Sequence, residues 1–132
     1  MAKEKKVIED VQGEVKVQDE VTKTDAPIYA GGPLQSQVDE WKGAYGQVYL
    51  TEVDDDDTFI WRVLNRKEFK EVMKVESDAM YREERVCELC ILWPEDYTFD
   101  SISDGKAGVP TILSEQIMEK SGFAPKTGPI AI

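Results

Sequence analysis

Residues 46–74 read GQVYLTEVDDDDTFIWRVLNRKEFKEVMK. Two runs that mix apolar and polar residues, 48–53 and 59–63, flank four consecutive aspartates at positions 54–57. Alternating runs on either side of a short polar connection are typical of a β-hairpin. Asn65 follows, with Glu68 three residues later, which is the spacing of a reciprocal cap at a helix start. We therefore predict a strand, an acidic turn, a second strand and a helix, around which the remaining chain is organised.

Two helices are predicted next to this hairpin, because apolar residues recur there at spacings of three and four. The first spans residues 34–45 and stops at Gly46. The second follows Asn65. The apolar stripes of the two helices consist of Leu34, Val38, Trp41 and Tyr45 in the first and Phe69, Val72 and Met73 in the second.

A third helix is predicted from Ser77 or Asp78, either of which can cap its start. The apolar pattern runs on toward Trp93, and Pro94 ends it because proline has no N–H to donate. Residues 94–108 contain several turn-forming residues, and we predict them to be a polar connection.

A fourth predicted helix begins near Pro110 and closes at Gly122, which suits a left-handed cap. The fold class is therefore α+β, a small domain in which a β-hairpin packs with about four helices over residues 34–123. Residues 1–33 lack an aromatic before Tyr29, and we predict a flexible arm that either orders on a larger assembly or stays a solvated tail. Residues 124–132 are predicted to be an extended tail.

The composition is acidic, with 27 Asp and Glu against 16 Lys and Arg and a formal net charge of −11. Binding to nucleic-acid phosphates requires clustered cations, and the basic residues here are interleaved with a larger number of acids, so no nucleic-acid partner is expected. The longest wholly apolar run, residues 90–93, is far shorter than the ~20 residues that span a bilayer. No apolar segment follows the Met-Ala-Lys-Glu-Lys-Lys start, and we expect neither a membrane span nor a secretory signal.

The chain contains no histidine, which removes the commonest general base and the commonest transition-metal ligand. Two other features invite a chemical role. The aspartates at 54–57 could hold a hard cation, yet they lack the alternate spacing and glycine bend of a calcium loop, and a solvated turn is favoured. Cys87 and Cys90 could form a redox or metal site, yet they fall late in an amphipathic helix, and two buried apolar side chains are favoured. We expect no enzyme, no metal and no cofactor.

Both faces of the predicted hairpin carry apolar side chains, since neighbouring residues of a strand point to opposite sides. One face can cover the helices of the domain while the other meets a partner. Aromatic stripes are more often core than binding surface, and the division between the two faces stays open at this point. The residues predicted to bind a partner are Trp41, Tyr45, Tyr49, Phe59, Ile60 and Trp61.

Five short motifs follow one another in a recognisable order. They are Trp-Lys-x-x-Tyr-Gly-x-Val-Tyr at 41–49, Phe-Ile-Trp-Arg-Val-Leu at 59–64, Asn-Arg-Lys-Glu-Phe at 65–69, a Cys-x-x-Cys helix running into Leu-Trp-Pro-Glu, and a last helix ending Ser-Gly-Phe. Over residues 38–123 this order resembles the small tail assembly chaperones and small virion proteins of tailed bacteriophages. None of the motifs is a catalytic signature.

The resemblance implies a non-enzymatic protein that binds the tape measure protein during tail assembly, in the cytoplasm of the host. An alternative within the same resemblance is a minor structural protein of the capsid, tail or baseplate, which is retained in the virion and whose arm orders on neighbouring subunits. The partners implied are phage proteins, with a homo-oligomer as a further possibility. A redox or metal site at the two cysteines is the remaining hypothesis.

Overall fold

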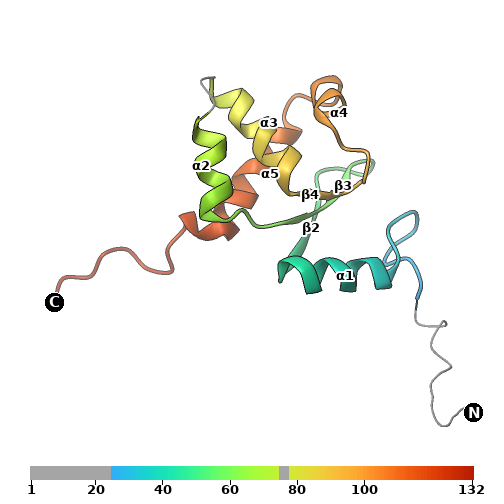
Figure 1. Ribbon diagram of the computed structural model, residues 1–132, viewed down its shortest axis with the longest axis horizontal. Coiled ribbons are helices and arrows are strands. Elements are labelled where there is room, and N and C mark those ends of the chain that lie inside the picture. The colour runs from blue at the N-terminus through green and yellow to red at the C-terminus, as the bar shows by residue number, and fades with distance from the viewer. Residues whose placement is uncertain (1–24, 75–77) are drawn as a thin grey trace, which may run out of the picture. The chain divides into compact units, whose positions relative to one another are not determined.

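The computed structural model describes residues 25–74 and 78–132. The chain divides into two compact units, Met1–Ala44 and Tyr45–Ile132. Figure 1 labels the helices and strands along the chain. Residues 1–24 of the predicted arm lie outside the described residues.

The first unit contains a turn that leads into helix α1 (Gln35–Tyr45), which runs one residue past the unit's end. The turn is closed by a backbone hydrogen bond of 2.9 Å from the Ile28 N–H to the Pro33 carbonyl oxygen. The carboxylate of Asp25 accepts a hydrogen bond of 2.9 Å from the Ser36 N–H, which caps the first turn of the helix. The predicted helix is confirmed, and residues 25–33 of the predicted arm form a defined turn.

The second unit is built on the predicted hairpin. Strands β2 (Val48–Glu52) and β3 (Thr58–Arg62) pair in antiparallel fashion, with Tyr49 opposite Trp61. The turn between them is held by the carboxylate of Asp54, which accepts hydrogen bonds of 3.0 Å and 2.9 Å from the N–H groups of Asp56 and Asp57. The short Asp54 side chain therefore stabilises the turn by bonding to backbone N–H groups two and three residues ahead of it.

A third strand, β4 (Ile91–Trp93), pairs with β3 and gives the order β2-β3-β4. The prediction that the third helix continues toward Trp93 is wrong, because α3 (Ala79–Cys90) ends at Cys90. Ile91 is extended, with φ −73° and ψ 123°. Pro94 disfavours the helical conformation at Trp93, the residue before it, and the edge of β3 offers hydrogen bonds to the whole extended segment 91–93.

Helix α2 (Arg66–Lys74) begins with the predicted reciprocal cap. The Asn65 side-chain oxygen accepts from the Glu68 N–H at 2.8 Å, and the Glu68 carboxylate accepts from the Asn65 N–H at 3.1 Å. Asp78 caps α3 by accepting from the Tyr81 N–H at 3.0 Å. Both helix starts therefore follow from single polar side chains next to the helix.

Helix α4 (Phe99–Asp104) lies inside the stretch predicted to be a polar connection. Its start carries a capping box formed by Thr98 and Ser101, in which a serine replaces the usual Glu or Gln. Helix α5 (Val109–Met118) runs on into a π-helical turn, η2 (Glu119–Phe123), where Gly122 has the positive φ of 101° expected of a left-handed cap. Phe123 then lies against Phe69 of α2, with ring centroids 4.9 Å apart.

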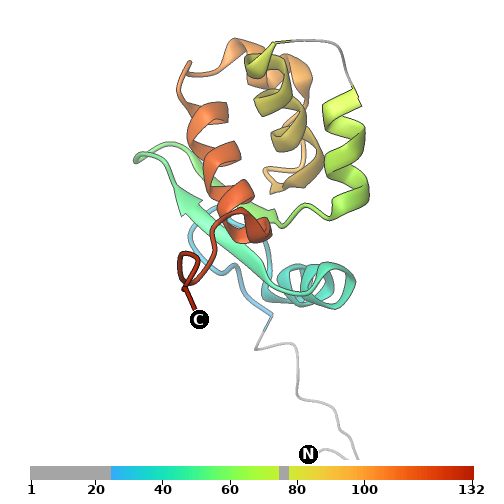
Figure 2. The same cartoon turned by 90° about the vertical axis from the view of Figure 1, so that its left-hand side faces the viewer.

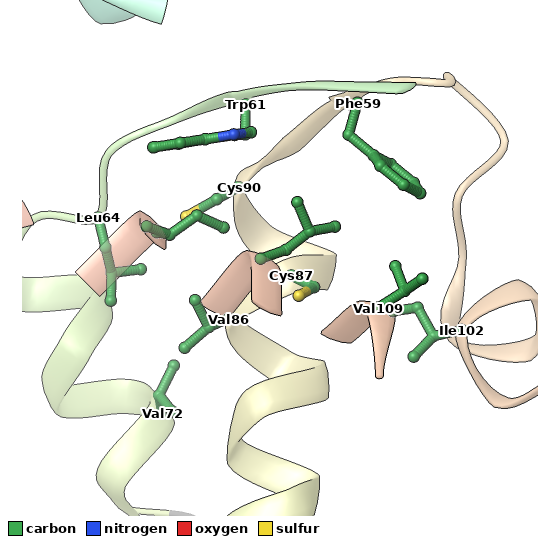
Figure 3. Packing of buried hydrophobic residues seen from close by; sticks show 11 residues of the cluster. Phe59, Trp61, Leu64, Val72, Val86, Cys87, Cys90, Ile102 and Val109 are labelled. Atoms are coloured by element: carbon green, nitrogen blue, oxygen red, sulfur yellow. The ribbon is translucent and has the colours of Figure 1, made fainter. Parts of the chain in front are cut away.

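The helices α2, α3 and α5 stand on one side of the hairpin, as Figure 2 shows. The core lies between them and the sheet, and Figure 3 shows how its side chains converge. Trp61 and Phe59 enter it from β3, and Val86, Cys87 and Cys90 enter it from α3. The second unit is therefore an α+β fold with one hydrophobic core. Its buried members are Phe59, Trp61, Leu64, Val72, Val86, Cys87, Cys90, Ile102, Val109, Leu113 and Ile117.

Within residues 25–74 and 78–132, none of the helices has both the length and the apolar character needed to cross a bilayer. Residues 124–132 are exposed throughout.

We expect Leu113→Ala to lower the free energy of unfolding by about 2 to 5 kcal/mol, because it opens a cavity in the core. Leu113 is 0% exposed, whereas the neighbouring Ile112 on the same helix is 41% exposed. Ile112→Ala should cost less than about 1 kcal/mol. Unfolding in urea measures both losses, and equal values would contradict the burial of Leu113.

Candidate protein-binding site

Three of the six residues predicted to bind a partner lie in the interior. Phe59, Ile60 and Trp61 are each at most 4% exposed. Phe59 and Trp61 belong to the core under the helices, while Ile60 points to the opposite face of the sheet. In this conformation the three side chains offer a partner almost no surface, and their role in binding stays a prediction.

The other three predicted residues keep accessible area. Trp41 is half-buried on α1, and Tyr45 at the end of that helix is exposed. The guanidinium of Arg62 lies over the Tyr45 ring, 4.9 Å from its centroid. Tyr49 is half-buried on β2 and lines a large surface cavity.

This cavity, called the Tyr49 groove below, has a volume of about 510 Å³. Its floor contains two stacked aromatic rings, Tyr49 and Trp61, with centroids 4.7 Å apart and planes inclined by 23°. On the other side of the groove, the ammonium of Lys120 lies 5.7 Å from the Tyr49 centroid. The groove is lined by Tyr49, Leu50, Thr51, Glu52, Trp61, Gln116, Glu119 and Lys120.

A chain of side-chain hydrogen bonds fixes the floor of the Tyr49 groove. The indole N–H of Trp61 donates to Thr51 Oγ1 at 2.9 Å, and the Thr51 hydroxyl donates to Gln116 Oε1 at 2.6 Å. The chain links β3, β2 and α5, so the strand and the helix that border the groove are held at a fixed separation. A buried indole N–H also needs such a partner, because leaving it unsatisfied costs free energy.

The backbone of β2 contributes an open edge. Among the described residues, β2 stands at the end of the strand order, and its one paired side faces β3. The hydrogen bond from the Val53 N–H to the Asp57 carbonyl identifies the paired positions, which alternate along the strand. The N–H and C=O groups of Leu50 and Glu52 therefore point outward along the groove. An extended segment can add to an edge of this kind as a further strand.

The negative charge of the acidic turn is offset in part by Lys106. Lys106 forms ion pairs with Asp54 and Asp57, the latter at 3.1 Å. The hydrogen bond from Lys106 lowers the pKa of the Asp54 carboxyl, and the same contact raises the pKa of Lys106. Among residues 25–74 and 78–132, no group of three or more carboxylates and thiols is placed to hold a metal ion.

Cys87 and Cys90 are free thiols in the core. The Cys87 thiol lies 3.5 Å from the Pro110 carbonyl oxygen, to which it donates a weak hydrogen bond. Burial raises the pKa of each thiol to about 12. Reactive and metal-binding cysteines have lowered pKa values and accessible sulfur atoms. Cys87 and Cys90 have raised pKa values and buried sulfur atoms instead.

Six of the eight lining residues of the groove were not among the predicted binding residues, and three of the six illustrate the reason. Thr51 lies on the same strand face as Tyr49, and the two-residue period of a strand was the available signal. Gln116 and Lys120 come from the other border, 65 or more positions along the chain from Thr51. Only the packing of α5 on the sheet brings them there.

Comparison of this chain with protein-family models, with curated proteins and with solved structures found no match.

We expect Thr51→Val to lower the free energy of unfolding by about 1 to 3 kcal/mol, because valine keeps the shape but cannot accept the Trp61 indole N–H. Thr58→Val on the neighbouring strand is the matched control, because the Thr58 hydroxyl bonds to no side chain that the structure describes. Thermal unfolding of both variants measures the difference. Similar losses would show that the hydrogen-bond chain does not stabilise the groove.

We expect the folded protein at pH 8 to react with a chromogenic disulfide reagent far more slowly than the same protein in denaturant. Both thiols are 0% exposed, and their raised pKa values of about 12 leave almost no thiolate at that pH. Absorbance of the released chromophore measures the rate. Rapid reaction without unfolding would contradict the burial of the pair.

Proposed function

We propose that this chain is a non-enzymatic binding protein of bacteriophage morphogenesis, most similar in role to a tail assembly chaperone that binds the tape measure protein. The observation that carries the proposal is the Tyr49 groove, in which an open strand edge runs beside stacked aromatic rings. The order of motifs over residues 38–123 supports the phage context. The proposal assigns no chemistry to Cys87 and Cys90, which are buried and protonated.

Recognition at the groove would combine two kinds of contact. An extended segment of the partner pairs with the outward-facing backbone groups of Leu50 and Glu52, which supplies affinity without regard to sequence. Every second side chain of that segment then lies on the same face as Tyr49, the accessible ring of the stacked pair, while Trp61 supports that ring from the core. Because Trp61 holds it in place, the Tyr49 ring gives an apolar contact area of fixed orientation, which favours apolar partner side chains.

The acidic composition supports the chaperone role. A net charge of −11 keeps the protein and its complexes apart through mutual repulsion. A partner whose apolar segments are covered by such a chain is thereby protected from aggregation while assembly proceeds. In this proposal the complex forms in the host cytoplasm.

A second candidate is a minor structural protein that stays in the virion. It is favoured by residues 124–132, which are exposed throughout and include the apolar Ile130 and Ile132. A segment of this kind can lie on a neighbouring subunit and order there.

Affinity purification of the tagged full chain from infected cells tests the proposal. The chaperone role predicts co-purification of the tape measure protein and absence of this chain from purified particles, as measured by mass spectrometry. Presence in the particles at many copies would support the structural role instead. Recovery of no phage protein would overturn both.

We expect Tyr49→Ala to reduce recovery of the partner about tenfold, because it removes the accessible ring of the groove floor. Tyr49→Phe keeps the ring and should retain most of the binding. Asp55→Asn, in the exposed acidic turn, should leave recovery unchanged.

Quantitative mass spectrometry of the same purification measures these recoveries. Melting temperatures show whether each variant remains folded at the assay temperature. Greater loss with Asp55→Asn than with Tyr49→Ala would assign binding to the turn and not to the groove.

A further inference from the structure

Three surface hollows adjoin one aromatic side chain, Phe69 of α2. The first, of about 280 Å³, lies between α2 and α3 and also touches Met118 of α5. The second, of about 270 Å³, lies over the outer side of α2. The third, of about 200 Å³, lies between the start of α2 and the Ser121–Phe123 turn. We call this region the Phe69 surface, and it shares no lining residue with the Tyr49 groove.

The fold leaves large apolar side chains uncovered at the Phe69 surface. Met73 is 46% exposed, and Phe123, whose ring packs on Phe69, is also exposed. Val72 and Val86 line the hollow between α2 and α3, with Met118 beneath. Flexible methionines and aromatic rings at the surface are typical of protein-binding sites, because they bury a large area and adapt to the partner.

The second hollow is lined by cations on an otherwise acidic chain, whereas the first is lined by the opposite charges of Arg82 and Glu83, and Lys74 of the second also pairs with Glu71 at 3.2 Å. Arg66, Lys70 and Lys74 line the second hollow, and the Arg66 guanidinium lies 5.4 Å from the Phe69 centroid. The whole chain has a net charge of −11. A local cluster of cations on an acidic protein favours a partner that places carboxylates at this rim.

The spacing of the hollows favours a helix as the partner. Together they extend along α2 from Arg66 to Met73, seven residues that rise by roughly 10 Å, and the second hollow alone covers that length. The same rise separates positions i and i+7 of a second helix laid alongside. An extended strand repeats its side chains on one face about every 7 Å, which does not match this spacing.

We infer that the Phe69 surface binds an amphipathic helix of another protein, with apolar residues at i, i+3 or i+4 and i+7 and with Asp or Glu on both flanks. The apolar stripe fills the hollows on either side of Phe69. The acidic flanks meet Arg66, Lys70 and Lys74. This surface is independent of the Tyr49 groove, and it stands even if that groove binds nothing.

Fluorescence anisotropy with the purified full chain and three labelled synthetic helical peptides tests the inference. The first peptide carries a leucine stripe with glutamate flanks, the second the same stripe with lysine flanks, and the third a scrambled order of the first. The glutamate-flanked peptide should bind at least about tenfold more tightly than either of the others. Equal binding of the scrambled peptide, or tighter binding of the lysine-flanked one, would overturn the inference.

Two pairs of variants locate the site. Lys70→Glu should weaken the glutamate-flanked peptide about tenfold, whereas Lys67→Glu, on the same helix but outside the hollows, should change its affinity less than about twofold. Met73→Ser should weaken it about tenfold, whereas Met80→Ser, at a methionine that is 68% exposed and lines none of the hollows, should not.

These variants change exposed side chains, so each should melt within a few degrees of the parent. Tyr49→Ala should leave the peptide's affinity unchanged, which separates failure of this inference from failure of the proposed function. Equal effects within either pair of variants would place the binding site elsewhere.

Discussion

The second unit depends on one arginine that joins three elements. Arg62, near the end of β3, donates to the Glu68 carboxylate of α2 at 2.8 Å and to the Leu89 carbonyl oxygen near the end of α3 at 2.9 Å. Its side chain is only 12% exposed, so both contacts are largely shielded from water. Glu68 also caps α2 through Asn65, and the hydrogen bond from Arg62 lowers the pKa of the Glu68 carboxyl. The Glu68 carboxylate therefore stays ionised while it caps α2 and bonds to Arg62 of β3.

Polar contacts to β3, at this junction and at Thr51, position the two proposed binding surfaces. The start of α2 and the end of α3 are fixed to the same strand, and the hollow between the two helices lies just beyond. On the other side of β3, the Thr51 hydroxyl ties the strand pair to α5 and fixes the width of the Tyr49 groove. Each surface is thus bordered by elements that polar contacts hold to the central strand, which preserves its shape before a partner binds.

The parts of this fold that were predictable from sequence are those that local chemistry decides. The hairpin follows from two strand-like runs around a polar turn, and α2 from the reciprocal pair Asn65 and Glu68. Strand β4 was missed because its apolar run fits the end of a helix equally well, and only the unpaired edge of β3 selects the extended form. Helix α4 was missed because its cap relies on Ser101, outside the usual capping pattern.

The proposed binding surfaces were less predictable than the fold. Tyr49 was named among the candidates, yet Phe59 and Trp61 turned out to be core because the helices cover their face of the sheet. Which face is covered depends on contacts between distant segments, and a strand pattern with apolar residues on both sides does not specify it. The Phe69 surface shares that origin, since its hollows form only where α2 and α3 meet α5 and the Ser121–Phe123 turn.

The segment made of α5 and η2 forms part of the border of both surfaces, with Gln116 and Lys120 on one side and Ser114 and Met118 on the other. A helix with its side chains is about 10 Å across, so the two surfaces are separated by little more than one helix diameter. A single long partner that engages one of them holds its neighbouring residues near the other at high effective concentration. Two weak contacts can then give a high overall affinity, and the partner still dissociates one contact at a time.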